Sequence, residues 1–323
     1  MESDLQLRPI TPDDFDRIVD MTRGNFASTD YIPYVFNSWL TNPGYHFMGL
    51  ELNEQLIGIQ NVRWTDGNKT VWLEGFRIHP EFRRKGYGTQ FHQLIVKYSK
   101  EILKAQRLRL SSCTNLKESI KIVEAGGSKI IDKMHYYFTR DLIQAQTKVF
   151  EVEGLNSFQN SNKNVSLSII SFQELVSLLL ELDPETREEL VPRNDIHFNW
   201  STYELCEQNF KTLQGLIQII FCERDESGKL ISFSIGADTI LDSNDHFVWS
   251  TTIYTLDKHS FFTHLKEHMK AGNERKRTDI EVFWKTQLNN IMDELQLTPY
   301  IEPFYDGTFY LLYEKPFLEQ EIV

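Results

Sequence analysis

The pattern of apolar and polar positions predicts alternating strands and helices along the first 140 residues. Apolar alternation is typical of half-buried strands, and the Asp66-Gly67 pair between the third and fourth expected strands is typical of a hairpin turn. A threonine followed by acidic residues begins the first expected helix at Thr11. The expected order is strand, helix, helix, three strands, helix, strand, helix and strand. The strands lie at residues 4–9, 45–52, 56–64, 70–78, 107–113 and 128–140, and the helices at 11–26, 33–41, after Gly88, and at 115–125.

One helix in this series shows a single apolar stripe. Its residues Phe91, Leu94, Ile95, Tyr98 and Ile102 recur at helical spacing, so we expect that face to be buried. The helix follows a strand and a proline, Pro80, which cannot donate a ladder bond.

The second half of the chain repeats part of this pattern. Strands are expected at 221–236 around a turn and at 246–256, and a helix at 259–275. Strand, helix and strand then follow at 278–285, 286–297 and 304–316. Between the halves, residues 144–165 are rich in Asn, Ser and Gly, which favours an exposed connector. We therefore expect a domain at 1–143, a linker at 144–165 and a second domain at 166–323.

Length and charge limit the possible functions. A chain of 323 residues exceeds the usual single domain, and a net charge of -12 disfavours nucleic-acid or anionic-membrane binding. The start, MESDLQLRPI, lacks the features of a signal peptide, and no long apolar run follows. Cysteines 113, 206 and 222 are few and widely spaced, which favours reduced thiols. A cytoplasmic protein is expected, of undetermined oligomeric state.

A basic, glycine-containing stretch, HPEFRRKGYGTQFHQ at residues 79–93, stands out in this acidic chain. It could be a polyanion clamp, a phosphate-binding helix start, a solvated turn or a nucleic-acid arm. A helix start offers free N–H groups and the positive end of the helix dipole, and glycine lets a ligand approach the backbone. Thr89 and Phe91 stand where a Walker loop and a dinucleotide fingerprint need lysine and glycine, which excludes both motifs.

The segment HLKEH at residues 264–268 matches a zinc-binding pattern, H-x-x-E-H. That site also needs a further carboxylate well downstream. The amphipathic neighbours and Lys266 suit an ordinary solvated helix face instead. We expect no metal.

The first half resembles the acyl-CoA-binding core of GNAT-type N-acetyltransferases. The resemblance lies in the run F-R-I-H-P-x-x-R-x-x-G-x-G from Phe76 to Gly88, and in the order of elements over residues 4–140. Closer still, DYIPYVFNSWL at 30–40 and VWLEGFRIHPEFRRKGYG at 71–88 are similar to the histidine N-acetyltransferase (N-acetyltransferase 16) family. The resemblance implies an α+β fold with a mixed sheet, the GNAT acyl-CoA N-acyltransferase fold, and the echo in the second half suggests a degenerate GNAT-like domain.

The resemblance also implies where acetyl-CoA would bind. The backbone of Phe76 and Ile78 would pair with the pantetheine arm, and Asn115 would face the same arm. The diphosphate would lie on the loop and helix start formed by Arg83, Arg84, Lys85, Gly86, Tyr87, Gly88 and Thr89.

An acetyl transfer needs a neutral amine, because a protonated amine has no lone pair. We expect Glu74 to act as the base, on the face of Phe76 and Ile78 unless Gly75 introduces a bulge. The alternative is a carboxylate paired with a neighbouring arginine. Ile122 stands where many family members place the tyrosine that protonates the leaving thiolate, which leaves the general acid open.

For the acceptor, Asp30 and Tyr31 lie in the loop that typically covers the substrate pocket in this family. The alternative for these residues is helix capping and core packing. The predicted activity is acetylation of the α-amine of a free amino acid, with L-histidine as the leading candidate. Another small amine, a peptide N-terminus, or a non-catalytic acyl-CoA-binding module are the alternatives.

Overall fold

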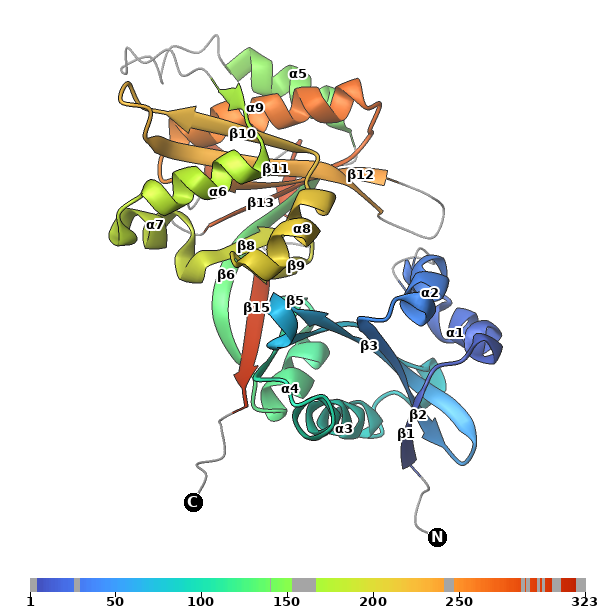
Figure 1. Ribbon diagram of the computed structural model, residues 1–323. Coiled ribbons are helices and arrows are strands. Elements are labelled where there is room, and N and C mark those ends of the chain that lie inside the picture. Colours follow the sequence, from blue (N-terminus) through green and yellow to red (C-terminus); the bar gives the residue numbers. More distant parts are fainter. Residues whose placement is uncertain are drawn as a thin grey trace, which may run out of the picture. The chain divides into compact units, whose positions relative to one another are not determined.

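The computed structural model describes residues 5–25, 30–139, 141–152, 167–240, 247–285, 288, 291–294, 297, 300–303 and 309–317 (Figure 1). By its contacts the chain divides into two compact units. The first comprises Met1–Asp132, Ile240–His246 and Leu311–Val323, and the second comprises Lys133–Thr239 and Phe247–Tyr310. None of the helices in the described part combines the length and apolar character that a membrane crossing requires.

The first unit has the predicted order of elements. Its strands β2, β4 and β5 begin and end where the apolar alternation does. Short 3₁₀ helices occupy Pro12–Asp14, Asp66–Asn68 and Pro80–Phe82. The elements are β1 (Leu5–Pro9), α1 (Phe15–Thr22), α2 (Ile32–Thr41), β2 (Tyr45–Leu52), β3 (Gln55–Thr65), β4 (Thr70–Ile78), α3 (Tyr87–Glu101), β5 (Arg107–Cys113), α4 (Lys117–Ala125) and the start of β6 (Lys129–Thr139).

The sheet of this unit is mixed. Strands β1 to β4 form antiparallel neighbours in chain order, and β4 then pairs in parallel with β5 through the crossover helix α3. Figure 1 shows α1 and α2 on one face of the sheet and α3 and α4 on the other. Under α1 and α2, aromatic residues such as Phe36, Trp39 and Phe47 form a buried core.

The last described strand of the chain, β15 (Phe309–Pro316), is the next neighbour of β5. Arg109 Nε donates to Glu314 Oε2 at 2.8 Å, and the N–H of Phe317 donates to the Gln106 carbonyl at 2.8 Å. Residues 311–317 therefore lie in the first unit, although the sequence placed them in a domain at 166–323.

Two predicted segments differ in the structure. The stripe on α3 ends before Ile102, which is 67% exposed, because the helix itself ends at Glu101. The expected connector begins with a helix, α5 (Leu142–Val152), whose residues Leu142, Ala145 and Val149 are fully buried. Residues 153–166 lie outside the described part.

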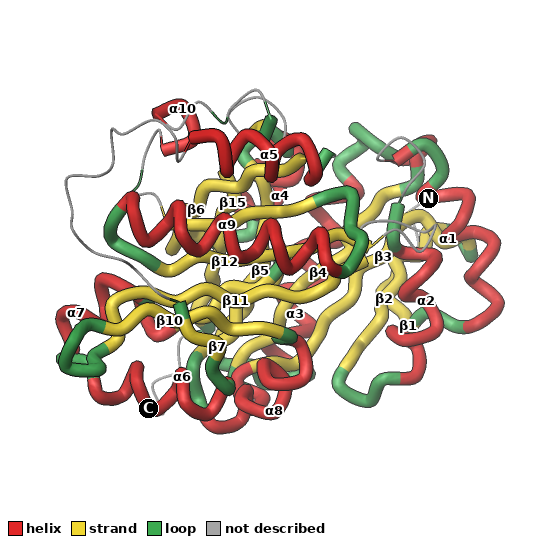
Figure 2. Tube along the Cα trace, turned by 90° about the horizontal axis from the view of Figure 1, so that it is seen from above, coloured by secondary structure: helices red, strands yellow, loops and turns green. Residues whose placement is uncertain are grey.

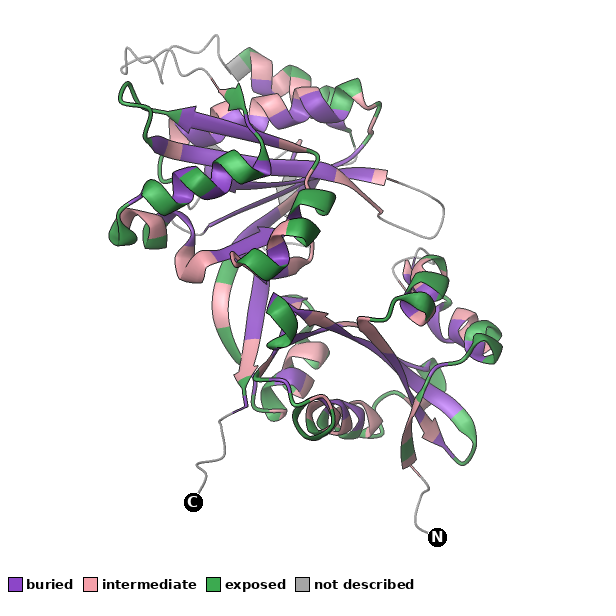
Figure 3. Cartoon of the chain, viewed as in Figure 1, coloured by how far each residue is buried: buried purple, intermediate pink, exposed green. Residues whose placement is uncertain are grey.

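The second unit contains most of the remaining elements. They are α5, β7 (Ser168–Ile169), α6 (Phe172–Glu181), α7 (Pro184–Leu190), β8 (Asp195–Phe198), β9 (Ser201–Glu204), α8 (Glu207–Leu216), β10 (Ile219–Arg224), β11 (Leu230–Ile240), β12 (Phe247–Tyr254), α9 (Lys258–Glu274), β13 (Ile280–Lys285), α10 (Ile291–Glu294) and β14 (Glu302–Pro303). Its sheet runs in the order β6-β13-β12-β11-β10-β7, and β8 pairs with β9 separately. Figure 2 shows α5 and α9 side by side, and Figure 3 shows β12 and β13 almost wholly buried.

The strands β12 and β13 repeat the architecture of β4 and β5. They pair in parallel from Trp249 opposite Ile280 to Ile253 opposite Trp284, and α9 connects them. The side chain of the N-cap residue, Asp257, caps the start of α9. Its Oδ1 atom accepts a hydrogen bond from the N–H of Ser260 at 2.9 Å. A carboxylate at this helix start already occupies the position where an anion would bind.

Candidate active site

The parallel strands β4 and β5 separate partway along their length. Their pairing runs from Thr70 opposite Arg107 to Leu73 opposite Leu110 and goes no further. Beyond Leu73, strand β4 continues along β3 as far as Ile78. The two strands therefore open a gap at their carboxyl ends, covered on one face by α3 and α4.

A β-bulge lies on β4 where this gap opens. Glu74 is opposite Asn61 and Arg77 is opposite Ile59, so the single residue Gln60 faces both Gly75 and Phe76. Gly75 has a φ of 68°, which favours glycine. The bulge at Gly75, which the sequence predicted as the exception to strand alternation, is thus present. Alternation along β4 therefore does not determine on which face of the sheet the Glu74 side chain lies.

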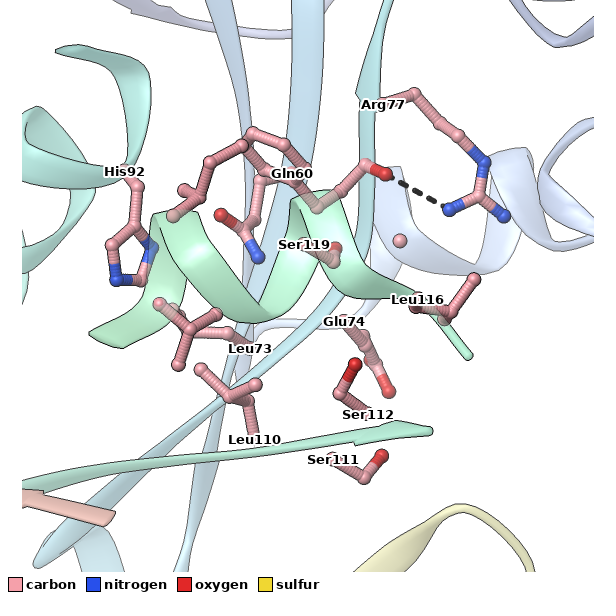
Figure 4. A pocket seen from close by; sticks show the side chains of 14 residues that line it. Gln60, Leu73, Glu74, Arg77, His92, Leu110, Ser111, Ser112, Leu116 and Ser119 are labelled. Atoms are coloured by element: carbon pink, nitrogen blue, oxygen red, sulfur yellow. Dashed lines mark hydrogen bonds between the residues drawn. The ribbon is translucent and has the colours of Figure 1, made fainter. Parts of the chain in front are cut away.

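The gap between the two strands contains a cavity of about 130 Å³. Its walls come from β3, β4, β5, α3 and α4, and Figure 4 shows the side chains that line it. Glu74, Phe76 and Arg77 line the cavity from β4, and Ile122 lines it from α4. The bulge therefore leaves both Glu74 and Phe76 at the cavity.

The Glu74 carboxylate lies in a polar part of this wall. Its Oε1 atom accepts a hydrogen bond of 2.7 Å from Asn61 Nδ2, and Arg63 Nε lies 3.4 Å from the same oxygen. The Glu74 side chain is 22% exposed, whereas that of Arg63 is 9% exposed. A half-buried carboxylate, held from one side and open toward a cavity, is suited to accept a proton from a bound amine. Glu74 also makes the interaction of the alternative prediction, because it pairs with a neighbouring arginine, Arg63.

Asp30 and Tyr31 lie at the start of α2. Asp30 forms a two-bond ion pair with Arg77, with Nε to Oδ2 at 2.7 Å and Nη2 to Oδ1 at 3.1 Å, and it also accepts from the N–H of Ile32. Tyr31 packs edge-on against Trp39, and burial raises the pKa of its phenol. Asp30 precedes the N-cap residue Tyr31, binds the N–H of the first helical residue and holds Arg77 at the cavity, so its carboxylate acts through that arginine.

The loop before α3 combines left-handed backbone with a helix start. Arg84 has a φ of 60°, and Gly86, the N-cap residue of α3, has a φ of 84°. The backbone bonding of α3 begins with Gln90, whose N–H donates to the Gly86 carbonyl at 3.2 Å. The N–H groups ahead of Gln90 are those that a helix start leaves without intrahelical partners. Because glycine is the N-cap, the N-cap residue has no side chain to accept hydrogen bonds from them.

The side chains around this helix start divide into two groups. Arg84 and Lys85 are exposed, whereas Arg83 turns back to donate to the Ile78 carbonyl at 2.8 Å and to Asn25 Oδ1 at 3.0 Å. Thr89 and Tyr87 are half-buried. Two exposed cations, Arg84 and Lys85, next to a helix start with a glycine N-cap provide what a diphosphate requires.

Close packing fixes the position of the helix start. A Cβ on Gly88 would lie 3.0 Å from Ile122 Cδ1 and 3.6 Å from Phe76 Cζ. Glycine at 88 therefore lets α3 approach α4 and the bulged part of β4. Ile78 is 8% exposed beneath the same glycine.

Asn115 lies in the exposed turn between β5 and α4. The cavity wall nearby is formed by Leu116 and Ser119. The role predicted for Asn115 stays a prediction.

Sequence reasoning missed several polar residues that line the cavity, of which Gln60, His92 and Ser112 are buried. Each is less than 5% exposed, and Gln60 Oε1, His92 Nε2 and Ser112 Oγ have no hydrogen-bond partner among the described residues. Burial, with Lys315 nearby, lowers the pKa of His92 to about 4. The one signal in the sequence for His92 is its position directly after Phe91, at the edge of the apolar stripe that α3 buries.

The histidines of HLKEH lie in the core of the second unit, and the expected solvated face is wrong. Both are fully buried, because α9 packs this face on β11 and β12. His264 bonds to Ser232 and Ser234, and His268 bonds to Ser234 and to Trp249. Both ring nitrogens of each histidine are thus engaged. In the described part of the chain, no group of three potential metal ligands is arranged around a common point.

Residues 13–124 match the model of the acetyltransferase (GNAT) family. This stretch holds the separated strands, the cavity and the glycine start of α3, so it is a GNAT acetyltransferase domain.

Among curated proteins, the chain is similar to the histidine N-acetyltransferase of Oreochromis niloticus. The two are 22% identical over 226 residues, which cover 66% of this chain and 63% of that protein. The match thus spans less than two thirds of the relative's length.

Solved structures extend the similarity to the whole fold. The GCN5-related N-acetyltransferase of Sphaerobacter thermophilus has a TM-score of 0.57 and 11% identity, covering 97% of this chain and 95% of that chain. A tandem GNAT protein from the clavulanic acid biosynthesis pathway has a TM-score of 0.56 and 11% identity, covering 98% and 100%. The predicted GNAT fold with a second GNAT-like domain is confirmed.

Proposed function

We propose that this protein is an acetyl-CoA-dependent N-acetyltransferase that acetylates the α-amine of a free amino acid, with L-histidine as the leading acceptor. The observation that carries the proposal is the position of Glu74 in a cavity between separated parallel strands, next to a helix start without a capping side chain. The name of the Oreochromis relative supports histidine.

The chain's own residues suit each part of acetyl-CoA. The free amides at the start of α3, with Arg84 and Lys85 above them, would hold the diphosphate. The backbone of Phe76 and Ile78 would pair with the pantetheine arm, and Asn115 would face it. In the second unit, Asp257 caps the equivalent helix start, so the proposal assigns the coenzyme to the first unit alone.

Glu74 would take the proton that the amine must lose. An α-amino group has a pKa near 8 and is mostly charged at neutral pH, so a base helps by about 10² to 10⁴-fold. The neutral amine then attacks the thioester directly, its nitrogen bonds to the acetyl carbon, and the bond from that carbon to sulfur breaks. Glu74 passes this first proton to solvent, and the nitrogen gives its second proton to Glu74 or to solvent as the amide forms.

Asp30 and Tyr31 would shape the acceptor end of the cavity. Asp30 would do so by fixing the Arg77 guanidinium. The centre of the Tyr31 ring lies 5.9 Å from the carbon of the same guanidinium. The same proposal includes a cytoplasmic location, action on a small molecule without a bound metal, and no nucleic-acid partner.

A second candidate, a non-catalytic acyl-CoA-binding module, is favoured by Ile122, which brings methyl groups where a proton donor is usual. Measuring free-thiol release from acetyl-CoA with each of the twenty amino acids separates the candidates. Release with histidine above all others supports the proposal. Release with other amines only would change the acceptor, and coenzyme binding without release would favour the module.

A further inference from the structure

Ser112 lies where β5 has separated from β4. It is two residues beyond Leu110, the last residue of β5 that pairs with β4. Its side chain lines the same cavity as Glu74, and Figure 4 labels both residues. Ser112 is 4% exposed, and its hydroxyl has no hydrogen-bond partner among the described residues.

A buried hydroxyl without a partner is destabilising by about 1–3 kcal/mol. Such groups are rare in folded proteins, and each calls for an explanation, such as a ligand. The other serines of the cavity differ, since Ser111 has an interaction of its own and Ser119 is partly exposed on α4. Ser112 is therefore the serine whose hydroxyl is buried and directed to the cavity without a bond.

We propose that Ser112 donates a hydrogen bond to the sulfur atom that leaves when the acetyl group is transferred. This inference rests on the proposed function. When the amine attacks, the electron pair of the broken carbon–sulfur bond stays on sulfur, which becomes a thiolate. Ile122 offers that sulfur no donor, whereas the Ser112 hydroxyl has a free one.

The proton balance assigns Ser112 a hydrogen bond and not a proton transfer. A thiol has a pKa of about 8.5, far below that of an aliphatic hydroxyl, so a thiolate does not deprotonate serine. Glu74 and solvent take the two protons that the amine loses, and the thiolate leaves as such or is protonated by solvent. A hydrogen bond to a charged group contributes about 1.5–3 kcal/mol, or roughly 10- to 150-fold in rate.

The test is the pKa of the thiol of bound coenzyme A. It is read from the ultraviolet absorbance of the thiolate as pH is varied, in the full chain saturated with coenzyme A. Two variants of equal shape make the comparison, because Ser112→Thr keeps a hydroxyl and Ser112→Val replaces it by a methyl group. We expect the thiol pKa to be about one unit or more lower in the wild type and Ser112→Thr than in Ser112→Val. Ser38→Ala, at an exposed serine of α2 that does not line the cavity, should leave the pKa unchanged.

Turnover gives a second readout. The kcat of Ser112→Val and Ser112→Ala should fall about 10- to 100-fold with the KM for acetyl-CoA nearly unchanged. If wild type and Ser112→Val give the bound thiol the same pKa, the role of Ser112 is overturned while the proposed function stands. If the wild type does not bind coenzyme A at all, both fail.

Discussion

Trp39 lies so close to Gly75 that a β-carbon on residue 75 would be 2.4 Å from Trp39 Cη2. The φ of Gly75, 68°, is also one that other residues rarely adopt. Together the indole and the backbone reserve this position of the bulge for glycine. The bulge in turn sets the positions of Glu74 and Phe76 at the cavity.

Gly75→Ala should therefore lower the free energy of unfolding by about 1–3 kcal/mol, because it combines a left-handed backbone with a contact that the indole must relieve. Urea unfolding measures the change. Gly215→Ala, in α8, is the matched control, since a β-carbon there meets nothing within 4 Å. An unchanged stability of Gly75→Ala would show that the bulge tolerates a side chain.

Glu74→Gln should lower kcat by about 10² to 10⁴-fold at neutral pH and leave the KM for acetyl-CoA unchanged, because glutamine cannot accept the proton. The difference from wild type should narrow as pH rises past about 8, where the amine is already neutral. Initial rates across pH measure both effects. Glu81→Gln, an exposed change near the same loop, is the control. Equal rates for Glu74→Gln and wild type at every pH would remove Glu74 from the mechanism.

Asp30→Ala should destabilise the first unit by about 3–5 kcal/mol, because it leaves the guanidinium of Arg77 without its buried partner. Replacing both residues, as in Asp30→Ala with Arg77→Met, should recover much of that loss. Where the variants fold, the KM for the amino acid should rise far more than that for acetyl-CoA. Equal rises would indicate general damage to the fold in place of a role at the acceptor end.

The buried histidines should make the protein sensitive to acid. Burial lowers the pKa of His264 to about 3 and that of His268 well below its usual value. The unfolded chain therefore binds these protons from about pH 6.5 downward while the folded chain does not, and stability is lost as pH falls toward about 3. Glu281 opposes this, since burial raises its pKa to about 7 and the folded state takes up its proton first.

His264 and His268, and His92 down to about pH 4, each lower the free energy of unfolding by about 1.4 kcal/mol per pH unit below about pH 6.5. Glu281 offsets one such proton between about pH 7 and 4.5. Urea unfolding at several pH values between 7 and 4 measures the slope. His264→Gln, whose amide can bridge Ser232 and Ser234, should reduce the slope by one proton. A pH-independent stability would contradict the neutral, buried state of these rings.

The order of elements in the first unit could be predicted because the periods of strands and helices differ and glycine and proline mark their ends. Strands β2, β4 and β5 match their predicted bounds for this reason. Gly75 inside a strand pattern signalled a bulge, but a single sequence does not show that Trp39 would lie against it. The burial of His92 depends in the same way on α4, a separate element.

Long-range pairing could not be predicted from local patterns. The pattern at residues 304–316 predicts a strand but does not identify its neighbours. Strand β15 (Phe309–Pro316) lies next to β5, some 200 residues earlier, and next to β6. The prediction of a solvated face around HLKEH was wrong for the same reason. The two histidines are buried against Ser232, Ser234 and Trp249, which lie on other strands and cannot be placed there from the local pattern.

Calorimetry of acetyl-CoA binding tests the central claim that the start of α3 holds the coenzyme. The wild type should bind one equivalent, and Arg84→Glu with Lys85→Glu should weaken binding by about tenfold or more, because the exposed cations face the diphosphate. Lys97→Glu with Lys100→Glu, further along the same helix, makes an equal charge change and should bind nearly as the wild type does. No binding by the wild type, or equal affinities in both double variants, would contradict the claim.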